Sequence, residues 1–132
     1  MVARVARAED FERAFKELTK RKADALYQPN ISILSNNRDR IIELALKARL
    51  PHFSVNLDTA AAGGLLSYGT SIEENYRRAA ALVDKILRGA KPGELPVEQV
   101  ERIQMIVNLK TAKAVGVKLS PATMLRADKV IE

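Results

Sequence analysis

Apolar residues recur every three to four positions in several stretches of the chain, which is the spacing of one face of an α-helix. The clearest stretch is 9–21, whose apolar residues on this face are Phe11, Ala14, Phe15 and Leu18. The same criterion predicts further helices from Asn36 or Asn37 to Ala48, over residues 111–115, and from Ser120 to about Asp128.

The longest helical pattern follows a short apolar run, and together they organise the centre of the chain. Residues 72–88 repeat apolar positions at helical spacing, and Ser71 in front of them is a good N-cap. Glu74 follows three residues later, as a capping box requires. Gly69, between the apolar run and this helix, allows a backbone turn that a side chain would hinder. A strand that delivers a turn to a helix N-terminus is where open α/β folds bind small ligands.

Short apolar runs between the helices predict strands, at residues 2–6, 23–28, 52–55, 65–68 and 101–109. The last run alternates apolar and polar residues, which is typical of a strand covered on one face. Residues 56–62 are expected to form a loop. Strands that alternate with helices are typical of right-handed β-α-β units. We therefore expect one α/β domain over residues 1–132: a three-layer αβα arrangement with a mainly parallel, flavodoxin-like sheet.

The composition is that of a globular protein and excludes some kinds of site. The chain has 132 residues, of which 47% are hydrophobic and 29% charged. It contains no cysteine, so it forms neither a disulfide framework nor a thiolate metal site. No apolar run reaches the roughly 18 residues of a membrane span. The first residues lack the apolar core of a signal peptide, which predicts a cytoplasmic location if the chain is the complete product.

The net charge of +6 invites a nucleic-acid hypothesis, but the charge pattern favours an ordinary solvated surface. Most Lys and Arg residues are interleaved with Glu and Asp, and the most basic cluster, 20–22, is only three residues long. Aromatic residues make up just 5% of the chain, which leaves little for base stacking. We expect no nucleic-acid partner, and nucleic-acid binding ranks third among the functions considered.

No constellation of residues in the sequence predicts catalysis. There is no phosphate-binding glycine motif, and His52 is the only histidine, at the start of a predicted strand. Ser67 and Ser71 lack the nucleophile-elbow context, and Asp58 has no acidic partner near it in sequence. We therefore predict no enzymatic activity, no cofactor and no metal site.

Binding of a small solute is better supported, because polar residues follow the predicted strands. Ligand contacts are expected at Asn30, Asn56, Asp58, Tyr68, Gly69 and Thr70. Asn56 and Asp58 suit a ligand amine, and the amides after Gly69 suit a carboxylate. The adjacent residues 73–74, both glutamate, oppose an anion there. The alternative is that Asn56 and Asp58 only form a turn and that the serine before the helix only caps it.

Several motifs resemble the substrate-binding proteins of a group of bacterial ABC transporters, often named uncharacterised periplasmic components. The resemblance covers nearly the whole chain and is carried by residues 10–15, 23–26, 62–69, 76–80, 83–92, 95–99, 107–114 and 125–131. It implies a type I periplasmic binding fold, in which two α/β lobes close on a ligand through a hinge, and it matches only the C-terminal part. Residues 30–33 depart from the family pattern, in which an acidic or aromatic residue often follows the corresponding strand.

The resemblance implies a solute-binding component, or a fragment of one, that binds a small solute such as an amino acid without chemistry. It also implies an ABC permease as partner and a periplasmic location, and it places the ligand loops at 29–30, 56–58 and 68–70. The alternative function is a cytoplasmic flavodoxin-like regulatory or protein-interaction module. One lobe supplies only one wall of a cleft, so we expect weak solute binding and a homodimer that covers the exposed apolar surface.

Overall fold

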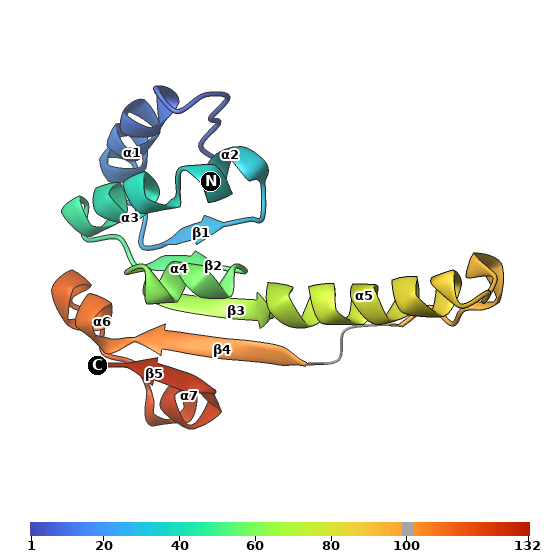
Figure 1. Ribbon diagram of the computed structural model, residues 1–132. Helices are drawn as coiled ribbons and strands as arrows, with labels where there is room; N and C mark the ends of the chain where they lie inside the picture. The colour runs from blue at the N-terminus through green and yellow to red at the C-terminus, as the bar shows by residue number, and fades with distance from the viewer. Residues whose placement is uncertain (99–101) are drawn as a thin grey trace.

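A five-stranded sheet in the order β1-β2-β3-β4-β5 forms the centre of the molecule (Figure 1). The computed structural model describes residues 1–98 and 102–132. The strands are β1 (Leu26–Gln28), β2 (His52–Ser54), β3 (Leu66–Thr70), β4 (Ile103–Asn108) and β5 (Lys129–Ile131). β1, β2 and β3 run parallel to one another, β4 is antiparallel to β3, and β5 is parallel to β4.

Helices connect and flank the strands. They are α1 (Asp10–Lys20), α2 (Ser32–Asn36), α3 (Arg38–Lys47), α4 (Leu57–Ala61), α5 (Ile72–Leu87), α6 (Leu109–Val115) and α7 (Pro121–Arg126), with a single 3-10 turn, η1 (Pro92–Glu94). The predicted α/β fold with a mainly parallel sheet is confirmed, as are the periodic helices that became α1, α3 and α5.

The hydrophobic core between α1 and α3 follows directly from their apolar periodicity. Its buried members are Phe11, Phe15, Leu18, Ile41, Ala45 and Leu50. α4 packs on β2, β3 and β4, and the nearby Leu65, Ala60 and Val107 have no measurable exposure. Side chains of this size each stabilise the fold by roughly 1.5–3 kcal/mol when fully buried, less for alanine.

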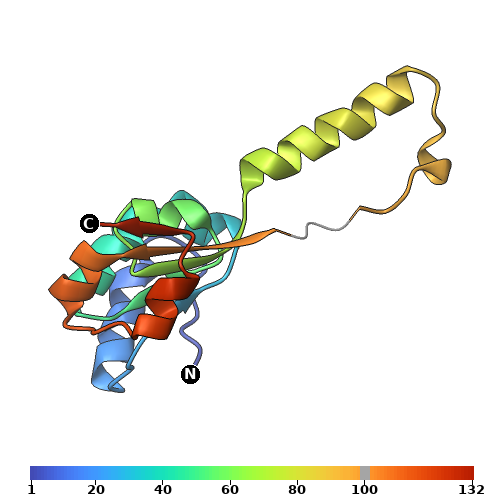
Figure 2. The same ribbon diagram turned by 90° about the horizontal axis from the view of Figure 1, so that it is seen from below.

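α5 extends away from the sheet instead of packing on it (Figure 2). None of its sixteen residues is buried, although Ile72, Tyr76 and Val83 lie on one apolar side and are more than half exposed. The chain leaves the sheet at the end of β3, runs along α5, and returns in β4. Because of this excursion, β4 lies antiparallel to β3 rather than parallel to it.

The predicted strand at residues 2–6 is wrong, because this segment pairs with no strand of the described sheet. Ala3 and Val5 still pack against the core cluster. The segment therefore keeps the alternating burial of a strand but has no hydrogen-bonded neighbour, and a strand exists only through such a neighbour.

Other boundaries differ from the sequence predictions for local reasons. Residues 57–61, expected in a loop, form α4, because its buried Thr59 and Ala60 pack against the sheet. β5 was not predicted, and the helix expected to run to about Asp128 ends two residues earlier. The second predicted strand, 23–28, is shorter in the structure and forms β1. Residue 101 of the last predicted strand lies outside the described residues. Within 1–98 and 102–132, no helix combines the length and apolar character needed to cross a bilayer.

Candidate functional site

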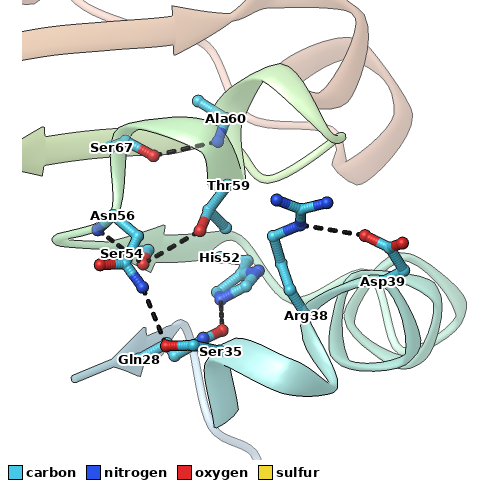
Figure 3. Close-up of polar contacts among 10 residues, drawn as sticks. All are labelled: Gln28, Ser35, Arg38, Asp39, His52, Ser54, Asn56, Thr59, Ala60 and Ser67. Atoms are coloured by element: carbon cyan, nitrogen blue, oxygen red, sulfur yellow. Dashed lines mark hydrogen bonds and ion pairs between the residues drawn. The ribbon is translucent and has the colours of Figure 1, made fainter. Parts of the chain in front are cut away.

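The polar residues that follow β1 and β2 meet at one edge of the sheet. Asn30 lies two residues after β1, and Asn56 lies two residues after β2. Ser35 of α2 joins them, because its hydroxyl donates to Asn30 Oδ1 (3.3 Å). The same hydroxyl accepts from Asn56 Nδ2 (3.1 Å) (Figure 3). We call Asn30, Ser35 and Asn56 the amide cluster. Parallel strands end at the same edge of a sheet, so two residues 26 positions apart in sequence share one site.

A network of hydroxyl groups holds Asn56 and α4 in place. The Asn56 backbone N–H donates to Ser54 Oγ (3.1 Å), and Thr59 Oγ1 donates to the same oxygen (3.2 Å). On the other side, Ser67 Oγ accepts from the Ala60 N–H (3.0 Å). Ser54, Thr59 and Ser67 are all buried, and buried hydroxyl groups with satisfied hydrogen bonds fix local geometry. The network therefore orients the edge of the amide cluster (Figure 3).

Asp58 stands in the first turn of α4, next to Asn56, with an exposed side chain. A carboxylate at this position is stabilised by the N–H groups of a helix start. It also places a negative charge two residues after Asn56 in the chain. The structure thus joins two of the residues that the sequence predicts, Asn30 and Asn56, through Ser35, which sequence reasoning missed. Asp58, the third predicted residue, lies two positions after Asn56.

The remaining predicted contacts, Tyr68, Gly69 and Thr70, lie within β3 rather than in a turn after it. The predicted turn at Gly69 is therefore wrong. Glycine is needed there for a different reason: a Cβ at this position would lie 2.0 Å from the Val55 carbonyl oxygen. Tyr68 is 51% exposed, and Thr70 Oγ1 accepts a hydrogen bond from Asn75 Nδ2 (3.3 Å). The predicted N-cap is confirmed, since Ser71 Oγ accepts from the Glu74 N–H (3.3 Å).

The single histidine is a buried structural group. His52 Nε2 lies 2.9 Å from Gln28 Oε1, which joins β2 to β1, and both side chains are only 2% exposed. Burial lowers the pKa of the His52 imidazole to about 4, so the ring is neutral at physiological pH. Among the described residues, no three His, Cys, Asp or Glu side chains gather in a way that could hold a metal ion.

The arrangement suits recognition of a polar solute through amide groups. An asparagine side chain offers both a carbonyl acceptor and an N–H donor. Two such groups lie together in the amide cluster, and the exposed Asp58 follows Asn56 by two residues. Together they provide complements for an amine and a carboxylate. The signal for the asparagines in the sequence was their position after strands. Ser35 carried no such signal, because α2 is short and shows no apolar periodicity.

The sequence profile described as "ABC transporter substrate binding protein" matches residues 1–131. The chain belongs to this family. A curated relative, the "Tyrosine-binding protein" of Clostridioides difficile (strain R20291), is 24% identical over 97 residues, which are 74% of this chain and 28% of the relative.

Solved structures share the fold of this family member at low sequence identity. A conserved domain protein from Vibrio cholerae matches with a TM-score of 0.85 and 22% identity over 96% of this chain. An ABC domain in complex with L-Trp from Streptococcus pneumonia matches with a TM-score of 0.85 and 20% identity, also over 96%. The chain spans 42% and 43% of those two proteins. It therefore covers less than half of the length of its structural relatives.

Proposed function

We propose that this chain is the C-terminal part of a two-lobed substrate-binding protein that binds an amino acid in the periplasm, without chemistry, and delivers it to an ABC permease. The observation that carries the proposal is the amide cluster at the carboxyl ends of β1 and β2, with Asp58 two residues after Asn56. This edge is where open α/β sheets hold their ligands. The names of the relatives support an amino acid, because one is described as tyrosine-binding and another contains L-Trp.

The roles of the individual groups follow from their chemistry. The Asp58 carboxylate and the amide oxygens of Asn30 and Asn56 accept hydrogen bonds from the ligand ammonium group. The amide nitrogen of Asn56 donates to the ligand carboxylate after release from Ser35, and Tyr68 contacts the side chain. One lobe leaves the opposite face of the ligand in water, and each hydrogen bond that must compete with water is worth about 1 kcal/mol or less. The isolated chain therefore binds with a Kd on the order of millimolar.

Titration of the ¹⁵N-labelled chain with L-Trp and L-Tyr tests the site. We expect amide shifts at Asn30, Asn56 and residues 68–70. Asn56→Ala removes one or two hydrogen bonds and weakens binding about tenfold. The matched control is Asn36→Ala, which removes an exposed amide of α2 outside the cluster and leaves the affinity unchanged. Shifts confined to residues 91–98, or equal effects of the two substitutions, would contradict the proposal.

The proposal includes a homodimer for the 132-residue chain on its own. The apolar side of α5 is exposed, and so are Tyr68 and Ile103 at the adjoining ends of β3 and β4. The apolar residues on this side of α5 are spaced symmetrically about positions 79 and 80. They are Ile72, Tyr76, Ala79, Ala80, Val83 and Leu87. Two copies of α5 packed antiparallel about the central alanines would therefore match apolar with apolar residues. Glu74 would also face Lys85 of the second copy, which is a favourable charge pair.

A further inference from the structure

A cavity of about 1130 Å³ lies between the N-terminal segment and the edge strand of the sheet. One wall is residues 1–6, and the opposite wall is β1 with the segments on either side of it. Most of its floor is apolar and comes from α1, β1 and α2, with Phe11, Phe15, Leu18, Leu26, Ile33 and Leu34 as the main side chains. The cavity therefore opens directly onto the hydrophobic core cluster.

β1 presents the backbone N–H and C=O of Tyr27 to this cavity. It pairs with β2 on one side and is the end strand of the described sheet. The Leu26 N–H donates to the Pro51 carbonyl (2.8 Å), so the backbone N–H and C=O of Leu26 point toward β2. Since the backbone groups of a strand alternate in direction, the N–H and C=O of Tyr27 face the other way, toward the cavity. An edge of this kind is a template for another strand.

The opposite wall has the burial pattern of a strand without a partner. Ala3 and Val5 are half-buried against the core, whereas Arg4 and Ala6 between and after them are exposed. At the far end, the Ala6 N–H donates to Asp10 Oδ2 (3.0 Å), which ties the segment to the start of α1. Residues 2–5 form no backbone hydrogen bond within the described part of the chain, so their N–H and C=O groups are available to another strand.

We propose that the cavity is a slot for one added β-strand, taken from an extended, aliphatic polypeptide segment that lies between β1 and residues 2–6. The added strand bonds to Tyr27 on one side and to the N-terminal segment on the other. A strand that is covered on both faces is a continuous run of Val, Ile and Leu, which matches the apolar floor. The inference is independent of solute binding, because none of its residues belongs to the amide cluster.

Two observations favour a polypeptide strand over a small apolar molecule. The free groups that the slot offers are those of a strand edge, whose N–H and C=O match another backbone. The solved structures that share this fold contain more than twice the length of chain matched here. In those proteins, polypeptide outside the matched region exists that could supply such a strand.

The test uses the full 132-residue chain and a synthetic peptide, acetyl-EGVIVLVGE-amide, as probe. We expect protection from hydrogen exchange at Tyr27 and at residues 3–5 when the peptide binds. Tyr27→Pro removes the N–H that faces the slot and keeps the bonds to β2, because proline is tolerated at the outer side of an edge strand. It weakens peptide binding at least tenfold. The matched control, Tyr27→Ala, keeps the backbone N–H and therefore keeps the affinity for the peptide. The control peptide EGVPVPVGE does not bind, because its prolines lack the N–H groups of a strand.

A second measurement places the same segment in cis, ahead of Met1 on a flexible Gly/Ser linker. We expect the fusion with EGVIVLVGE to have a higher urea midpoint than the fusion with EGVPVPVGE. Tyr27→Pro abolishes this difference in midpoint. Three outcomes would overturn the proposal. They are equal peptide binding by Tyr27→Pro and Tyr27→Ala, protection confined to other parts of the chain, and a Tyr27-dependent dimer that the peptide does not dissociate.

Discussion

At the scale of single residues, burial changes what His52 can do. Its pKa is lowered from 6.5 to about 4 because the charged ring would lose its water. Between these two pH values the unfolded chain binds a proton that the folded chain does not. The free energy of unfolding therefore falls as the pH decreases from 6.5 to 4, by up to about 3 kcal/mol.

Urea denaturation across this pH range measures the effect. Carboxylates also titrate in the lower part of the range, so the matched comparison is His52→Gln, which is neutral at every pH and keeps an amide beside Gln28. We expect the difference in stability between the wild type and this variant to change by about 1.4 kcal/mol per pH unit between 6.5 and 4. Parallel pH profiles for the two proteins would show that the ring titrates normally when folded.

Gly69 is the second residue whose surroundings decide its role. The backbone of β3 passes so close to Val55 that a Cβ would lie 2.0 Å from its carbonyl oxygen. Gly69→Ala forces two backbone segments apart, and we expect a loss of about 2–4 kcal/mol in the free energy of unfolding. Gly93→Ala is the control, since no atom lies within 4 Å of a Cβ there. Equal midpoints for the two variants in urea would contradict the close approach.

At the scale of elements, α5 relies on its own sequence for stability, because it buries none of its residues. Helices of about this length are marginal in water without tertiary contacts. α5 has an N-cap at Ser71 and three ion pairs at i, i+4 spacing: Glu73–Arg77, Glu74–Arg78 and Asp84–Arg88. Each exposed pair contributes only about 0.3–0.5 kcal/mol, so the cap is a large share of the total.

The substitution Ser71→Ala tests this dependence. We expect a loss of about 1 kcal/mol in local helix stability, seen as faster amide exchange over residues 72–76 at concentrations below self-association. The urea midpoint of the domain stays unchanged, because α5 adds nothing to the core. Ser71→Asp, which also caps, restores slow exchange. A fall in the global midpoint with Ser71→Ala would mean that α5 packs on the domain.

At the scale of the whole molecule, the exposed apolar side of α5 and the exposed Tyr68 of β3 favour self-association. We expect sedimentation at micromolar concentration to show twice the 14.6 kDa mass of one chain. Val83→Lys places a charge in the apolar interface of the antiparallel α5 pair, opposite Tyr76 of the second copy, and yields a monomer. The control Lys85→Gln, outside the apolar side of α5, has a small effect. A monomeric wild-type chain that binds an amino acid tightly would refute both the dimer and the weak single-lobe site.

The sequence alone determined the features that depend on neighbours along the chain. Helical periodicity over 9–21 and 72–88, and the cap at Ser71, were predicted correctly, because helix hydrogen bonds join residues only four positions apart. The positions of Asn30 and Asn56 after strands were predictable for the same kind of reason. The absence of cysteine settled the question of disulfides without any structure.

Only the tertiary structure decided the features that depend on partners distant in sequence. Residues 2–6 have the pattern of a strand but remain outside the sheet, because a strand needs a neighbour on which to form its ladder. Residues 57–61 form α4 because the sheet buries their apolar side, and Gly69 lies in β3 because it pairs with Gln104 of β4. Ser35 joins the amide cluster through contacts that bring together three separate segments. Such contacts are set by the fold, and no local spacing encodes them.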